Sequence, residues 1–176
     1  MSEIGELFLL ECKKSFRGLK SNAEKAIEQI SETDLHLFPE KESNNLTNLI
    51  KHLSGNMLSR FTDFLTTDGE KPDRNRDDEF VDRGETRDEL FNKWNKGWDC
   101  VFKALDELKP NDLSTVVKIR NEDHTVIRAL NRQLAHYAYH TGQIVYICKL
   151  IQSSEFKPLS MPRNPKKSLF APRKEN

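Results

Sequence analysis

Apolar side chains recur every three or four residues in four stretches of the chain, which is the spacing of one face of an α-helix. These stretches cover about residues 1–30, 46–65, 86–108 and 125–151. The last stretch is apolar or small around most of its circumference, so we expect that helix to have neighbours on several sides. Four amphipathic segments of this kind predict an all-α fold, a four-helix bundle.

The segments between these stretches favour loops and one small β element. Residues 66–85 are highly charged and contain little that could enter a core, which predicts a solvated loop. Residues 114–120 are β-branched and alternating, and the turn sequence Asn121-Glu-Asp123 follows them. This pattern predicts a short strand or β-hairpin before the last helix. Thr125 is then well placed to cap that helix.

The length of the chain indicates one domain. With 176 residues, it falls within the size range of a single hydrophobic core. We expect residues 1–155 to form the bundle. Residues 156–176 contain four prolines and mostly basic charges, which predicts an extended tail that Leu169 and Phe170 pin to the body.

The charge pattern excludes several function classes. Lys plus Arg (28) balance Asp plus Glu (28), so no basic field would attract nucleic acid, and a small-molecule or protein partner is favoured. A membrane helix needs roughly 18 uninterrupted apolar residues, and no stretch approaches this. Because a signal peptide is also absent, we expect a cytoplasmic protein that avoids membranes.

The cysteines indicate a reducing compartment. Cys12, Cys100 and Cys148 are odd in number and widely spaced, which favours buried thiols over disulfides.

Two histidines on the last predicted helix form half of a candidate metal site. His136 and His140 are four residues apart, so their imidazoles can converge on one ion. His52 is the best third ligand, because it falls beside small and polar residues on the shoulder of the second helix. His36 and His124 lie in a predicted loop and turn that would not fix their orientation. The pair alone is also compatible with histidines that bind no metal.

Two segments resemble the signatures of the DinB/YfiT-like metalloenzyme superfamily. They are residues 48–57, Asn-Leu-Ile-Lys-His-Leu-Ser-Gly-Asn-Met, and residues 133–145, Gln-Leu-Ala-His-Tyr-Ala-Tyr-His-Thr-Gly-Gln-Ile-Val. The resemblance covers most of the chain and is closest to an uncharacterised branch, a domain of unknown function. It implies a four-helix bundle that binds a divalent ion through His52, His136 and His140. It also implies a homodimer, and hydrolase or thiol S-transferase activity that in some members uses a low-molecular-weight bacterial thiol.

Three neutral imidazoles would leave open coordination positions on the ion, as in catalytic zinc sites. Such an ion can activate a water for hydrolysis or a thiol for attack on an electrophile, and the spacing does not choose between them. We therefore expect a divalent-metal-dependent thiol S-transferase or hydrolase acting on small molecules. Zinc or nickel suits the ligands best, with iron or manganese as alternatives. The rival hypotheses are a noncatalytic, stress-related, dimeric module that binds metal or a small ligand, and a structural bundle with incidental histidines.

Three further residues are candidates for the pocket or for support of the ligands. Glu11 interrupts the inward stripe that Ile4, Phe8 and Ser15 predict for the first helix. Asn56 and Gln143 lie about one turn from predicted ligands, where they could orient them or hold substrate. The alternatives are an exposed carboxylate for Glu11 and ordinary interhelical hydrogen bonds for Asn56 and Gln143. No residue is assigned as the catalytic acid or base.

Two tryptophans and two arginines are each compatible with a role in the pocket and with a role outside it. Trp94 and Trp98 could line a pocket for an apolar substrate, but aromatic residues at helical spacing favour a simple core. Arg60 and Arg132 could bind a substrate carboxylate, and a solvated surface position is the alternative. For both pairs the alternative without a role in the site is the favoured one.

Overall fold

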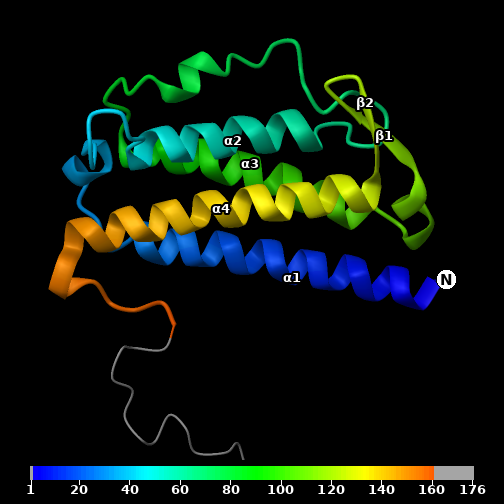
Figure 1. Cartoon of the computed structure of the whole chain (residues 1–176), viewed down its shortest axis with the longest axis horizontal. Coiled ribbons are helices and arrows are strands. Elements are labelled where there is room, and N and C mark those ends of the chain that lie inside the picture. Colours follow the sequence, from blue (N-terminus) through cyan, green and yellow to red (C-terminus); the bar gives the residue numbers. More distant parts are fainter. Residues whose placement is uncertain (1, 161–176) are drawn as a thin grey trace, which may run out of the picture.

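The computed structural model describes residues 2–160 and confirms the predicted helical bundle with a hairpin before the last helix (Figure 1). The hairpin is antiparallel and pairs Ile119 with Glu122 across its turn. The elements are α1 (Ser2–Ile27), α2 (Leu46–Phe61), α3 (Arg87–Glu107), β1 (Val116–Ile119), β2 (Glu122–Thr125) and α4 (Val126–Gln152).

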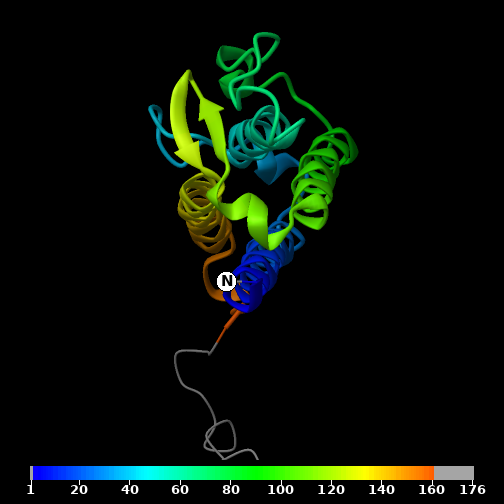
Figure 2. The same ribbon diagram turned by 90° about the vertical axis from the view of Figure 1, so that its right-hand side faces the viewer.

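The helices run in an up, down, down, up order. In Figure 1, α1 and α4 run the same way, and α2 and α3 run the opposite way. α2 packs mainly on α3, and α1 packs mainly on α4. Figure 2 shows the four helices end on around a common core. Because α2 and α3 are parallel, the segment between them, residues 62–86, must return along the length of the bundle, and it passes over α2 (Figure 1). We call it the crossover segment.

Side-chain caps fix the helix starts. Thr86 and Glu89 form a capping box at α3, because each side chain accepts a hydrogen bond from the backbone N–H of the other, at 3.3 and 2.8 Å. Thr125 caps α4 by accepting from the backbone N–H of Arg128 at 3.2 Å, as the sequence predicts. Asn45 does the same for α2.

Two helix predictions need correction. α2 ends at Phe61 rather than near residue 65, because Thr62 is extended and Asp63 takes a left-handed φ of 48° that turns the chain into the crossover segment. The predicted inward face of α1 is also wrong at its N-terminal end. Ile4 is 79% exposed, whereas Leu9 and Phe16 are buried. Farther along the helix the predicted face is correct, since Cys12, Ala23 and Ala26 are buried.

Aromatic residues fill the centre of the bundle. Trp94 and Trp98 are buried, and the ring of Trp98 lies 6.3 Å from that of Phe16 and 5.8 Å from that of Tyr137. The tryptophans therefore belong to the core. Buried thiols lie in the same core: burial raises the pKa of Cys12 to about 11 and that of Cys148 to about 12. These two thiols are free, protonated and packed as small apolar groups.

The prediction of a solvated loop over residues 66–85 is wrong for the middle of the crossover segment. A short 3-10 helix, η2 (Asp77–Phe80), forms there, and Glu79 is buried against α2. Asp68 anchors the segment to the hairpin, since its carboxylate accepts from the backbone N–H groups of Arg120 and Asn121 at 2.9 and 2.7 Å. Charged residues can be buried here because other charges and backbone groups pair with them.

The C-terminal prediction is only partly within the described residues. Residues 156–160 form neither helix nor strand, while Leu169 and Phe170, expected to pin the tail, lie outside the described range. Among residues 2–160, every helix is too short or too polar to span a membrane.

Candidate metal centre

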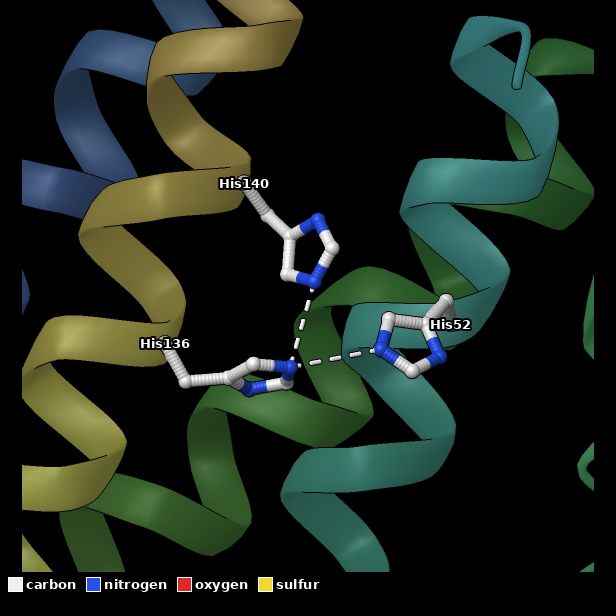
Figure 3. A group of neighbouring side chains, drawn as sticks. All are labelled: His52, His136 and His140. Atoms are coloured by element: carbon white, nitrogen blue, oxygen red, sulfur yellow. Dashed lines mark hydrogen bonds between the residues drawn. The ribbon is translucent and has the colours of Figure 1, made fainter. Parts of the chain in front are cut away.

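His52 projects from α2 toward His136 and His140 on α4, and the three imidazoles meet between the two helices (Figure 3). The Nε2 atom of His136 lies 3.4 Å from that of His52 and 3.1 Å from that of His140. One potential ligand atom from each residue lies within 4.8 Å of the others. Nitrogen ligands about 2.0–2.1 Å from one tetrahedral ion would be about 3.4 Å apart. The spacing of this group therefore fits a metal centre.

Hydrogen bonds orient two of the three rings. The Nδ1 atom of His52 lies 2.9 Å from Oε2 of Glu79, and that of His140 lies 2.7 Å from Oε1 of Gln143. Both partners are acceptors, so each Nδ1 carries the proton and each Nε2 keeps a free lone pair facing the other rings. The buried Nδ1 of His136 has no partner among residues 2–160. The donor set matches what a divalent ion requires from imidazoles.

The surroundings favour the neutral form of His136 and His140. Burial, and after it the neighbouring His140 and His52, together lower the pKa of His136 to about 3. Burial also lowers the pKa of His140, against a hydrogen bond from its ring to Gln143 that raises it. Neutral imidazole is the form that binds metals, so His136 and His140 are held in the form that a metal site needs.

Glu79 is a site residue that the sequence analysis missed. Burial raises its pKa, but hydrogen bonds from His52 and Arg74 outweigh this effect and lower the pKa overall. Arg74 donates to both carboxylate oxygens, at 2.7 and 2.9 Å. Gly55 on α2 makes room for this carboxylate, because a Cβ at that position would lie 2.9 Å from Cδ of Glu79. The ring of Phe80, 5.0 Å from that of His52, covers the histidine from the same side.

Asn56 and Gln143, both predicted near the ligands, line one cavity with the three histidines. Gln143 holds the ring of His140, as described above. Asn56 has another role: its Oδ1 accepts from Nε2 of Gln133 at 2.7 Å and from the hydroxyl of Tyr137 at 3.2 Å. It joins α2 to α4 beneath the cavity through ordinary interhelical hydrogen bonds.

Glu11 lies apart from this group. It is exposed on α1, and its carboxylate accepts a hydrogen bond from Lys14 at 2.7 Å. Ile4 and Ser15 on the same stripe are also exposed, so this part of the predicted inward face does not reach the site. His36 bonds to Asp82 at 2.9 Å, and His124 lies in β2, so neither joins the three histidines.

The cavity beside the histidines has a volume of about 290 Å³. Its walls come from α2, α4, the crossover segment and the turn of the hairpin. Small-molecule sites commonly measure roughly 300–1,000 Å³, so this cavity suits a small ligand. A larger cavity of about 510 Å³ lies between the start of the crossover segment and the C-terminal half of α3, and none of the three histidines lines it. The chemistry therefore concentrates in the smaller cavity.

Comparison with known families finds a match over most of the chain. The family described as "Protein of unknown function (DUF1572)" matches residues 3–165, a range that includes the three histidines and all of the four helices but the first residue of α1. No curated protein matches the chain significantly. The match confirms the prediction of an uncharacterised domain family.

Proposed function

We propose that this chain, which belongs to the DUF1572 family of proteins of unknown function, is a divalent-metal-dependent enzyme that acts on small molecules. One observation carries the proposal: the Nε2 atoms of His52, His136 and His140 converge from two helices beside a cavity. Catalytic zinc sites commonly use three protein ligands and keep a further position open for water or substrate. The resemblance to the DinB/YfiT-like superfamily supports the same ligand set.

The proposed reaction is thiol S-transfer or hydrolysis. A divalent ion held by the three histidines would lower the pKa of a bound thiol or water and so supply a nucleophile near neutral pH. The chain's own residues position the ligands, with Glu79 holding His52 and Gln143 holding His140. No cysteine lines this cavity within residues 2–160, so the reacting thiol would come from a small-molecule substrate.

Zinc and nickel are the proposed metals, because both bind imidazole well. Iron and manganese are the alternatives. Elemental analysis of the purified full-length protein tests metal binding directly. We expect about one ion per chain in the wild type and a large loss in His52→Ala and His136→Ala. His36→Ala is the matched control, because this histidine lies outside the cluster and bonds to Asp82. Equal and low metal contents in wild type and His52→Ala would remove the basis of the proposal.

Activity is tested with the metal-loaded protein, a low-molecular-weight thiol and a panel of chlorinated and epoxide electrophiles. Turnover that His136→Ala abolishes and His36→Ala retains supports the S-transferase. Hydrolysis of ester or amide substrates with the same pattern supports the hydrolase. Binding of the thiol without turnover in either assay favours the alternative, a noncatalytic metal- and ligand-binding module.

A further inference from the structure

The cavity beside the histidines is lined by five arginines from four parts of the chain. Arg60 comes from α2 and Arg132 from α4, Arg120 lies in the hairpin turn, and Arg74 and Arg76 belong to the crossover segment. These parts are far apart in the sequence and meet only in the fold. The cavity therefore has a concentration of positive charge that the neutral composition of the chain does not reveal.

Carboxylates neutralise only part of this charge. Glu79 pairs with Arg74 at 2.7 Å. Glu70 pairs with Arg60 at 3.0 Å and with Arg120 at 2.7 Å. Two carboxylates thus serve three of the five guanidinium groups, and the lining keeps an excess of positive charge. In addition, the Nε of buried Arg60 has no hydrogen-bond partner among residues 2–160.

Arg76 and Arg132 are the two lining arginines without a carboxylate partner among residues 2–160. Within residues 2–160, neither forms a salt bridge, and Arg132 donates only to the neutral Oε1 of Gln133, at 2.9 Å. Both arginines are exposed at the edge of the cavity, so a ligand can reach them from solvent. Arg132 lies one helical turn before His136 on α4, so a group bound there is close to the histidines.

We propose that the cavity binds a small anionic substrate whose carboxylate, phosphate or sulfonate group contacts Arg76 and Arg132 while its reactive end faces the histidines. This inference rests on the proposed function and specifies the substrate class of that site. The planar guanidinium fork matches carboxylate and phosphate oxygens in paired hydrogen bonds. Arg60 and Arg120 share the single carboxylate of Glu70, so this pair adds a net positive charge to the cavity.

Calorimetric titration of the full-length protein with inorganic phosphate and with succinate tests the proposal. Neutral succinamide, which has the size of succinate without its charge, shows whether the charge is what binds. Metal-free protein, prepared with a chelator, separates the arginines from direct coordination of the anion to a metal. We expect binding of both anions and none of succinamide. The variant Arg76→Gln/Arg132→Gln should bind phosphate at least about tenfold more weakly, because it loses two charged hydrogen-bond partners.

Arg128→Gln is the matched control, since this arginine is exposed on α4, one turn before Arg132, and does not line the cavity. It should bind phosphate as the wild type does. Unchanged affinity in Arg76→Gln/Arg132→Gln, or an equal loss in Arg128→Gln, overturns the proposal. Zinc content measured on the same samples separates the two proposals. If the zinc content is normal but phosphate binding does not depend on the two arginines, only this inference is overturned. If phosphate binding depends on the arginines but the protein takes up no metal, only the proposed enzyme is contradicted.

Discussion

Glu79 connects the crossover segment to the histidine group through the Nδ1 atom of His52, at 2.9 Å. Its carboxylate is itself held by Arg74. A carboxylate in this position fixes the ring orientation of a ligand and makes it more basic, and its loss typically weakens metal binding 10–100-fold. We therefore expect Glu79→Gln to lower zinc affinity by about that factor, measured by competition with a chromophoric chelator.

Asp78→Asn is the control for this prediction. Asp78 neighbours Glu79 in η2 but pairs with Arg83 at the surface, away from the histidines. Its neutralisation removes the same unit of charge and should leave zinc affinity within about twofold of the wild type, since exposed charges contribute little at a distance. Equal affinities in Glu79→Gln and wild type would show that His52 needs no carboxylate to bind the ion.

The three histidines could be predicted from sequence because helical periodicity fixes which residues share a face. His136 and His140 are one turn apart on one helix, and His52 follows from the polar shoulder of another. Glu79 could not be predicted in this way. It lies in a segment where nearly every residue is charged, and only the path of the crossover over α2 brings this carboxylate to a histidine 27 positions earlier.

At the level of the helix, Gly55 lets α2 accept the Glu79 carboxylate on its surface. Alanine favours a helix by up to about 1 kcal/mol over glycine, so Gly55→Ala gains intrinsic helix stability. Its methyl group would meet Glu79, however, and the carboxylate would have to move away from His52. We expect Gly55→Ala to weaken zinc binding several-fold, measured with the same chelator, while urea denaturation shows a smaller gain in stability than alanine normally gives.

Gly142→Ala on α4 is the matched control for this effect. Gly142 is exposed, follows His140 by two residues, and has no atom within 4 Å of a Cβ built on it. This substitution should raise the free energy of unfolding by about 0.5–1 kcal/mol and leave zinc affinity unchanged. If Gly55→Ala binds zinc as tightly as Gly142→Ala does, the close approach of Glu79 to α2 has no bearing on the metal centre.

Helix starts were predictable and helix faces less so. Thr125 caps α4 where its hydroxyl and the following pattern indicate. In α1, by contrast, apolar residues occupy neighbouring rows, so Ile4 and Leu9 fit alternative faces equally well by spacing. Long-range packing against α4 decides between them. The interpretation of Glu11 as a pocket residue assumed that Ile4 faces inward. Because Ile4 is exposed, Glu11 lies at the surface and away from the histidines.

For the molecule as a whole, the homodimer that the family resemblance implies stays a prediction, and α1 offers a surface for it. Ile4, Leu7 and Leu10 are 79, 57 and 47% exposed on the outer face of this helix. Burying such residues between two copies would be favourable. If this face is the interface, Leu7→Lys should convert a dimer to a monomer in sedimentation velocity experiments. Leu37→Lys, which adds the same charge at an exposed leucine before α2, should not. A dimer that persists in Leu7→Lys would locate the interface elsewhere.

The metal centre should also stabilise the whole bundle, because its ligands come from α2 and α4, which pack mainly on other helices. An ion that binds only the folded state at a free concentration 100 times its Kd adds about 2.7 kcal/mol, which raises the Tm of a chain of this size by roughly 5–10 °C. We expect this shift on adding zinc to metal-free wild type, its reversal by a chelator, and its absence in His52→Ala. His36→Ala should keep it, as its ring lies outside the cluster. An equal Tm shift in His52→Ala would show that the stabilising ion binds at another site and not at the three histidines.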